Sequence, residues 1–273
     1  MRLRYLLLPT FFIVGAGYLL SQPNWIFSLA ARFYPGALYN VDINPFPGAP
    51  TFVALTIDDG PGPYTEDILA LLARHDAKAT FFNLSENLPG YEAVVTQTVT
   101  SGHELGNHLT ADEASIRLSA SEFEADLLAA ESALFPFLEG KISGKETLDK
   151  ARQDQKAKLR WLRPGMGFYT PQMVDIAQRH GYRLALGNNF PYDTHLPNAR
   201  FASSFILANV QPGDIIVLHD GQGENADRGD RTLQTLKTIL PVLKNRGYTV
   251  TTLSELTAAA ESTSTTAELS VDP

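Results

Sequence analysis

The chain contains no cysteine. This absence excludes disulfide bonds, thiolate metal sites and a cysteine nucleophile, while it is compatible with either redox compartment. Basic residues are also few, because 22 lysines and arginines stand against 30 aspartates and glutamates, which gives a formal net charge of −8. That balance argues against nucleic acid or another anionic polymer as the main partner and fits a neutral or cationic substrate.

An uncharged apolar run is present at the N-terminus, from Tyr5 to Leu20, and Arg2 and Arg4 precede it. A positive segment followed by an apolar run is typical of an export signal. We predict that residues 1–22 form an uncleaved signal anchor, which would hold the rest of the chain at the membrane and outside the cytoplasm. A cleaved signal peptide is the alternative, with a small-x-small site at Ser28-Leu29-Ala30.

The remainder of the 273 residues is long enough for one sizeable core. Residues 23–50 contain five prolines and are interpreted as a linker or collar. Residues 51–257 are predicted to form a single domain, and the charge-rich stretch 141–160 within it a surface insertion. Residues 258–273, rich in serine and threonine, are predicted to be a disordered tail.

Within the predicted domain, strand-like and helix-like patterns alternate. The expected strands are 52–57, 79–82, 103–107, 159–163, 182–186, 214–218 and 248–253. Helical patterns separate most of them, with a capping-box sequence at Ser119-Ala120-Ser121-Glu122 and a Thr170-Pro171 start for another helix. Repeated βα units over about 200 residues predict an α/β fold, either a parallel barrel or a doubly wound sheet.

Two adjacent carboxylates, Asp58 and Asp59, follow the first predicted strand and precede the turn Gly60-Pro61-Gly62-Pro63. Like charges this close raise each other's pKa unless a positive group neutralises them. A divalent metal ion would do so and would leave one carboxylate as ligand and the other as base. The plainer interpretation is a pair of ordinary turn residues.

Reactive side chains follow several of the predicted strands. Asp58, His108, Arg163 and His219 each come directly after a strand-like run. Because the carboxyl ends of parallel strands share one edge, we expect these side chains to meet there. Chemistry is therefore a better explanation of the acid pair than turn formation.

The run Leu55-Thr56-Ile57-Asp58-Asp59-Gly60-Pro61 resembles the Thr-Phe-Asp-Asp-Gly-Pro motif of the polysaccharide deacetylases, also called the NodB-homology or carbohydrate esterase family 4 enzymes. The resemblance extends over about Thr51 to Leu256. It implies a distorted parallel (β/α) barrel. It also implies that Asp58 is the general base and that Asp59 binds a divalent metal ion, either zinc or manganese, cobalt or magnesium.

A second motif, Gly102-His103-Glu104-Leu105-Gly106-Asn107-His108, continues the resemblance. The family has a second metal-binding histidine four residues after the first, where this chain has Asp112. The implied metal ligands are therefore Asp59, His108 and Asp112, since a carboxylate is also a competent ligand. In the alternatives, His195 supplies the third ligand or the metal is lost.

Arg163-Pro164-Gly165-Met166-Gly167 resembles the family's Arg-x-Pro-Tyr-Gly motif. The resemblance implies that Arg163 orients Asp58, and that a backbone N–H near Met166 helps to hold an oxyanion. Because Met166 replaces the aromatic residue, Phe168 and Tyr169 are the candidates for a sugar-stacking surface.

Ile216-Val217-Leu218-His219-Asp220 resembles the family's Leu-x-His motif, which implies that His219 is the general acid. Asp193 lies in the region of a further motif, although the family's tryptophan is missing there. We expect Asp193 to bond to His219 and raise its pKa, and the alternative is an aspartate that serves only its loop.

The predicted function is metal-dependent removal of N-acetyl groups from N-acetylglucosamine-type units of a glycan, such as a chitooligosaccharide or a peptidoglycan-like polymer. We expect a monomer whose catalytic domain lies outside the cytoplasm. One alternative is a non-catalytic glycan-binding protein on the same fold with a degraded metal site. Another is an O-acetyl esterase or a different amidase, because the same charges develop during both reactions.

Overall fold

The computed structural model describes residues 24–43, 50–138 and 159–269. The predicted signal anchor over 1–22 lies outside these ranges, as does nearly all of the predicted insertion over 141–160. Among the described residues, no helix is both long enough and apolar enough to cross a membrane. The anchor therefore stays a prediction from the sequence.

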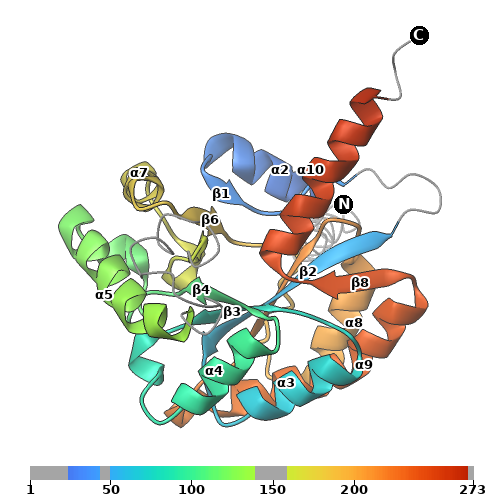
Figure 1. Ribbon diagram of the computed structural model, residues 1–273, viewed down its shortest axis with the longest axis horizontal. Coiled ribbons are helices and arrows are strands. Elements are labelled where there is room, and N and C mark those ends of the chain that lie inside the picture. Colours follow the sequence, from blue (N-terminus) through green and yellow to red (C-terminus); the bar gives the residue numbers. More distant parts are fainter. Residues whose placement is uncertain (1–23, 44–49, 139–158, 270–273) are drawn as a thin grey trace, which may run out of the picture.

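In the part of the chain that the structure describes, eight parallel strands form one sheet (Figure 1). Their order is β1-β6-β5-β4-β3-β2-β7, and β8 pairs with the first half of β2. The bounds are β1 Ala37–Leu38, β2 Thr51–Gly60, β3 Thr80–Asn83, β4 Glu104–Asn107, β5 Trp161–Leu162, β6 Arg183–Ala185, β7 Ile215–His219 and β8 Tyr248–Thr251. The predicted α/β class with a parallel sheet is confirmed.

The sheet curves so that backbone hydrogen bonds join its two edges, the segments beside β1 and β6 and the region of β7. Val41, just beyond the edge strand β1, donates its N–H to the carbonyl of Gly213 ahead of β7 (2.9 Å). Val217 in β7 donates to the carbonyl of Asn189, which follows β6 (3.0 Å). In a parallel sheet closed in this way the carboxyl ends of the strands share one rim, where the reactive residues are expected.

Helices cover the outside of the sheet (Figure 1), and they neighbour one another in the order α8, α9, α3, α4, α5 and α7. Their bounds are α2 Asn24–Phe33, α3 Thr65–Arg74, α4 Glu92–Thr100, α5 Ala120–Leu138, α7 Pro171–Arg179, α8 Ala199–Asn209, α9 Asp227–Asn245 and α10 Leu253–Leu269. Single 3-10 turns are η1 Ser85–Asn87, η2 Ser115–Arg117, η5 Gly165–Gly167 and η6 Gly223–Asn225.

Local sequence signals explain where several helices begin. At α5, the N–H of Ser119 donates to Glu122 Oε2 (2.8 Å) and the N–H of Glu122 donates to Ser119 Oγ (3.3 Å), which confirms the predicted capping box. The hydroxyl of Thr170 accepts from the N–H of Met173 at the start of α7, also as predicted. Helix α3 begins without a side-chain cap, because Tyr64 holds the cap position and makes no side-chain cap hydrogen bond.

Two segments outside the predicted domain belong to the fold. Residues 23–50 were interpreted as a linker or collar, yet they contribute helix α2 and edge strand β1, which pairs with β6. The tail prediction for 258–273 is wrong as far as Leu269, because α10 continues to that residue and extends away from the domain (Figure 1). The prolines of residues 23–50 misled the prediction because β1 gains stability from pairing with β6, which no local signal shows.

Candidate active site

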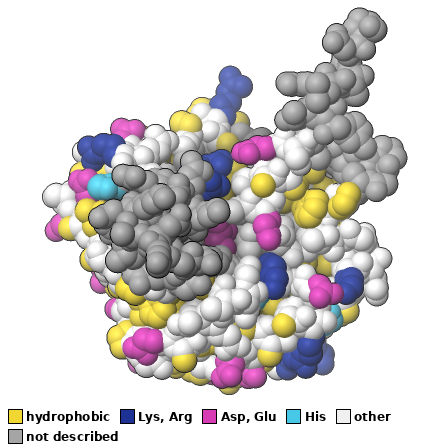
Figure 2. Space-filling model, viewed as in Figure 1, with side chains coloured by type: hydrophobic (Ala, Val, Ile, Leu, Met, Phe, Trp, Pro, Cys, Tyr) yellow, Lys and Arg dark blue, Asp and Glu magenta, His cyan; other side chains and the backbone are white. Residues whose placement is uncertain are grey.

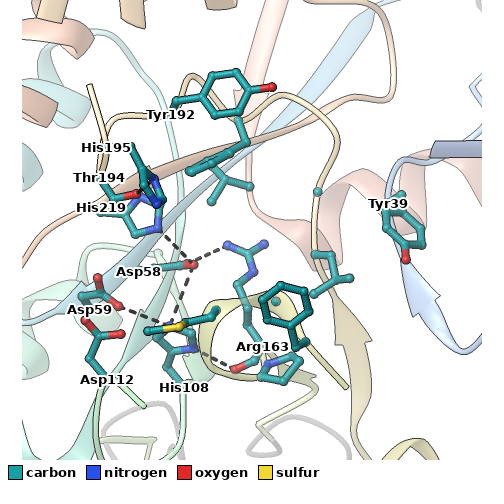
Figure 3. A pocket seen from close by; sticks show the side chains of 18 of the residues that line it. Tyr39, Asp58, Asp59, His108, Asp112, Arg163, Tyr192, Thr194, His195 and His219 are labelled. Carbon is teal, nitrogen blue, oxygen red and sulfur yellow. Dashed lines mark hydrogen bonds and ion pairs between the residues drawn. The ribbon is translucent and has the colours of Figure 1, made fainter. Parts of the chain in front are cut away.

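The side chains predicted to carry chemistry meet at the carboxyl rim of the sheet. They line a cavity of about 750 Å³, and Figure 3 shows Asp58 at its centre. Asp58 and Asp59 end β2, His108 follows β4, Arg163 follows β5, and His219 ends β7. The parallel topology thus brings together residues that are up to 161 positions apart, in agreement with the prediction from strand ends.

Asp58 and Arg163 form a buried ion pair. Arg163 Nη1 lies 2.6 Å from Asp58 Oδ1, and both side chains are about 4% exposed. Two further bonds fix the guanidinium, from Nε to the carbonyl of Ala185 (2.8 Å) and from Nη1 to Thr56 Oγ1 (2.8 Å). Asp58 Oδ2 lies 4.0 Å from Nε2 of both His108 and His219. The second carboxylate oxygen therefore faces the two imidazoles rather than the arginine.

Asp59 and His108 form a second buried pair, with Asp59 Oδ1 3.2 Å from His108 Nε2. Nδ1 of His108 donates to the carbonyl of Arg163 (2.7 Å), which turns Nε2 toward Asp59. Burial alone would raise the pKa of Asp59, but the hydrogen bond from His108 and the charges of His219, His108 and Arg228 lower it to about 2. Burial opposes protonation of His108, yet its bond with Asp59 and the charges of Asp58 and Asp59 raise its pKa.

His219 is held by Asp193, as the sequence predicted. Asp193 Oδ1 lies 3.0 Å from His219 Nδ1, and Asp193 Oδ2 accepts the backbone N–H of His219 (3.0 Å). Burial lowers the pKa of His219, but the charge and hydrogen bond of Asp193, together with Asp59 and Asp58, raise it to about 9. The imidazole is therefore a cation at neutral pH, with Nε2 directed at Asp58.

Asp112 does not join Asp59 and His108. Its Oδ2 lies 3.4 Å from Nη1 of Arg228, and the same Nη1 lies 2.6 Å from Asp59 Oδ2. A guanidinium thus stands between the two carboxylates that were expected to share a metal ion. Among the described residues, no group of three histidines or acids is placed to hold a metal ion. In this arrangement the predicted ligands do not fit a three-ligand metal site.

His195, the alternative third ligand, also lines the cavity, but it lies on the His219 side of the site (Figure 3). Its Nδ1 bonds to the hydroxyl of its neighbour Thr194 (2.8 Å), and the residue is exposed. It is not part of any ligand group of three within the described ranges. The choice between Asp112 and His195 as ligand stays a prediction.

The sequence motifs did not predict Arg228 as a site residue. Close packing at Gly229 and Gly62 explains how its side chain reaches the site. Gly229 follows it in the first turn of α9, where an added Cβ would lie 2.4 Å from Asp220 Oδ1 and 3.0 Å from Tyr64. Asp220 is completely buried and also packs against Gly62 of the turn after β2. The start of α9 is therefore docked directly on the turn that carries the acid pair. Gly229, directly after Arg228, is the sequence feature that permits this close approach of α9 to the turn after β2.

The cavity wall contains further residues that the sequence did not identify. Ile26 and Phe27 of α2 and Tyr39 after β1 line it, although this segment was interpreted as a linker. Of the two aromatic residues proposed for sugar stacking, Phe168 lines the cavity and is 58% exposed. Tyr169 is buried instead, and its hydroxyl donates to the carbonyl of Tyr34 (2.5 Å), so its predicted stacking role is wrong.

Comparison with known proteins gives consistent matches. Residues 47–185 match the family model described as polysaccharide deacetylase. The chain is 30% identical over 213 residues to a peptidoglycan-N-acetylglucosamine deacetylase of Bacillus cereus, covering 77% of this chain and 90% of that relative. It is 27% identical over 212 residues to a chitooligosaccharide deacetylase of a Bradyrhizobium species, covering 75% and 90%.

Solved structures of the same kind are similar. One is a crystal structure of the peptidoglycan N-acetylglucosamine deacetylase Bc1960 in complex with an N-hydroxybenzamide that carries a naphthalenyl group. It has a TM-score of 0.67 at 25% identity, covering 81% of this chain and 92% of that one. A mutant of a CE4 family pseudoenzyme with restored enzymatic activity has a TM-score of 0.66 at 25% identity, covering 82% and 71%.

Proposed function

Because this chain belongs to the polysaccharide deacetylase family, hydrolases that act on the amide bonds of N-acetylated glycans, we propose that it removes N-acetyl groups from N-acetylglucosamine-type units of a glycan. The observation that carries the proposal is the placement of Asp58 between the fixed guanidinium of Arg163 and the imidazole of His219. Asp58 Oδ1 is held by Arg163 at 2.6 Å, and Oδ2 faces His219 Nε2 at 4.0 Å.

The two sides of this arrangement suit a general base and a general acid. Arg163 holds Oδ1 of Asp58 and leaves Oδ2 facing the cavity, where it can accept a proton from water as the water oxygen bonds to the acetamide carbon. Asp193 holds the other nitrogen of His219, so that Nε2 can give its proton to the amine nitrogen as the carbon–nitrogen bond breaks. The products are acetate and a free amine on the sugar.

The rim of the cavity offers surfaces for the glycan and for the developing negative charge. Met166 lies at the rim with a left-handed φ of 56°, and we assign a backbone N–H near it to the oxyanion, as the sequence motif implies. Phe168 and Phe190 supply apolar ring surface on the cavity wall. Sugar rings pack on such surfaces through their apolar faces.

The divalent metal ion predicted from the sequence has no step in this proposal. Asp59 and His108 are the two residues that would hold it, and Asp112 would have to leave Arg228 to become the third. Zinc, manganese, cobalt and magnesium stay predictions. The release of acetate after exhaustive chelation, and after addition of each ion in turn, tests them.

Released acetate is also the main test of the proposed function. The purified chain is incubated with chitooligosaccharides and with peptidoglycan fragments, and acetate and new free amines are measured in parallel. Equal amounts of both products support N-deacetylation, whereas acetate without amine indicates an O-acetyl esterase. If folded protein releases neither product from any glycan, the proposal is wrong. The non-catalytic glycan-binding protein, which the lack of a three-ligand group among the described residues favours, is then the better assignment.

Substitution of the proposed base gives a sharper prediction. We expect Asp58→Asn to lower kcat by about 10²-fold to 10⁴-fold, because the amide cannot accept the proton. The variant also leaves Arg163 buried without its carboxylate, so its melting temperature should fall. Asp175→Asn, at an exposed position of α7, is the matched control and should change neither value. Full activity of Asp58→Asn would remove Asp58 from the mechanism.

The location of the enzyme is a further part of the proposal. We place the domain outside the cytoplasm, tethered by residues 1–22, because Arg2 and Arg4 precede the apolar run Tyr5–Leu20. Fractionation of cells that express the full chain, followed by protease treatment of intact cells or spheroplasts, tests both statements. Recovery of the chain in the cytoplasmic fraction would contradict them.

A further inference from the structure

Arg228 is a cation at the N-terminus of a helix, where the helix dipole disfavours positive charge. It lies in the first turn of α9, Asp227–Asn245, where the helix dipole is positive. A basic side chain at a helix N-terminus is repelled by the helix dipole and does not stabilise the helix. The side chain is also only 17% exposed. Its position therefore needs an explanation outside the helix.

The explanation is the pair of carboxylates that Arg228 contacts. Nη1 lies 2.6 Å from Asp59 Oδ2 and 3.4 Å from Asp112 Oδ2. The side chain of Asp59 is only 6% exposed, so its carboxylate needs a partner of opposite charge, and Arg228 is one of the groups in contact with it. The contact is built rather than incidental, since Gly229 allows α9 to approach Asp220 and Tyr64 more closely than a residue with a Cβ could.

The unusual residue at position 112 fits this arrangement. The family's histidine at this position would bring no negative charge to Arg228, whereas Asp112 does. A divalent ion bound by Asp59 and His108 would in turn place two positive charges next to the guanidinium, which raises the cost of binding the ion. The aspartate and the arginine thus form a matched pair that competes with a metal ion.

We propose that the guanidinium of Arg228 takes the place of a divalent metal ion at this centre. Under the proposed function, on which this role rests, the guanidinium faces the acetamide carbonyl oxygen and supplies positive charge as the oxyanion forms. Both ion pairs of Arg228 use Nη1. A guanidinium has five N–H donors, so Nη2 and Nε remain as donors that no ion pair of the described residues uses.

Zinc binding tests the inference without any assay of activity. Protein stripped of metal is titrated with Zn²⁺ in competition with a chromogenic chelator, and the wild type is compared with three variants. We expect Arg228→Gln to bind zinc at least about tenfold more tightly than the wild type, because the competing cation is gone. The double variant Arg228→Gln with Asp112→His should bind zinc about 100-fold more tightly than the wild type, because it supplies an imidazole as third ligand beside Asp59 and His108. Arg228→Lys keeps the charge and should bind as weakly as the wild type.

Arg231→Gln is the matched control, because Arg231 lies one turn further along α9 and forms no ion pair with an acid in the described structure. It should leave zinc affinity unchanged. Wild-type protein that binds zinc as tightly as Arg228→Gln overturns the inference. Circular dichroism confirms that each variant is folded, and the double variant, which replaces the lost charge pair with ligands, covers the case in which Arg228→Gln alone fails to fold.

Acetate release in excess chelator then separates this inference from the proposed function. Wild type and Arg231→Gln should keep their activity in chelator, while Arg228→Gln should lose about 10²-fold. Activity of the wild type that disappears in chelator and returns with zinc overturns the inference but leaves the proposed function standing. In the opposite outcome, the zinc affinities are as expected but no protein releases acetate. That result supports the replacement of the metal ion by Arg228 and overturns the proposed function.

Discussion

At the scale of single residues, backbone strain is concentrated at the site. Four non-glycine residues with left-handed φ lie in or next to the motifs, namely Asp59 (63°), Leu109 (70°), Met166 (56°) and Tyr192 (58°). Each such conformation costs about 1–3 kcal/mol and persists because the surroundings fix it. Here each one turns the chain directly beside a reactive side chain. The conformations explain how side chains from separate strand ends are all directed into one cavity.

The pair of Asp193 and His219 leads to a prediction about pH. A general acid works while it is protonated, so the pKa of about 9 for His219 predicts activity that falls above pH 9. Asp193→Asn removes the charge that raises this pKa and leaves burial, which lowers it. We expect the alkaline limb of the profile of kcat/KM to move down by at least about one pH unit. Asp175→Asn should leave the profile unchanged, and an unmoved limb in Asp193→Asn would exclude His219 as the acid.

The same ion pair contributes to stability over a defined range of pH. The pKa of His219 is higher in the folded chain than its ordinary value of 6.5, so folding takes up a proton. The contribution is complete below pH 6.5 and is lost as pH rises through about 9. Wild-type melting temperature should fall over this interval more than that of Asp193→Asn. Parallel curves for the two proteins would show that the pair adds no stability.

At the scale of elements, the start of α9 decides the composition of the site. The helix has a buried leucine face formed by Leu233, Leu236, Leu240 and Leu243. Its apolar pattern begins only at Leu233, so the first turn has no periodic signal in the sequence. That turn brings Arg228 to Asp59. A helix start placed from apolar periodicity alone would therefore miss this side chain.

Gly229→Ala tests how tightly that first turn is docked. Alanine normally stabilises a helix interior by about 1 kcal/mol relative to glycine. Here its Cβ would lie 2.4 Å from Asp220 Oδ1, so we expect a loss of about 1–3 kcal/mol in the free energy of unfolding. Thr238→Ala, at an exposed position of the same helix, is the control and should be neutral or stabilising in chemical denaturation. A stabilised Gly229→Ala would contradict the close docking.

At the scale of the whole molecule, residues 24–39 belong to the folded domain and contribute to the wall of its cavity. Strand β1 forms the edge of the sheet and α2 packs beside it, with the rings of Phe27 and Tyr39 6.0 Å apart. Both rings face the cavity. The alternative cleavage site Ser28-Leu29-Ala30 falls within α2, so cleavage there would remove part of the cavity wall.

Tyr39 provides the corresponding prediction. We expect Tyr39→Ala to raise KM for a glycan oligomer roughly threefold to tenfold with little change in kcat, because the ring binds substrate away from the reacting bond. Tyr39→Phe keeps the ring and loses the hydroxyl that lies 3.4 Å from Tyr169, so it separates stacking from the hydrogen bond. An unchanged KM in Tyr39→Ala would remove this wall from the binding site.

Charged side chains form no large patch of one sign on the face that Figure 2 shows. The formal net charge is −8, and on the face in Figure 2 acidic and basic side chains are interspersed rather than separated. A strongly charged substrate would be favoured by a large patch of one sign. For an N-acetylated glycan, the buried charges of the cavity matter more than the surface.

The sequence by itself determined the parallel α/β class and the positions of most strands, because apolar β-branched runs and cap residues are local signals. It also determined that Asp58, His108, Arg163 and His219 share one rim, since parallel strands place their carboxyl ends together. The partnership of Asp193 with His219 was predicted as well and is present at 3.0 Å.

Tertiary structure alone decided what surrounds Asp59. The position of Arg228 depends on how α9 docks on Asp220, and the role of residues 23–50 depends on pairing with β6. Neither contact leaves a periodic pattern in the sequence, because each joins segments through shape and charge rather than through repeated apolar positions. Local patterns specify the elements, whereas the docking of loops and helix ends specifies which charges meet.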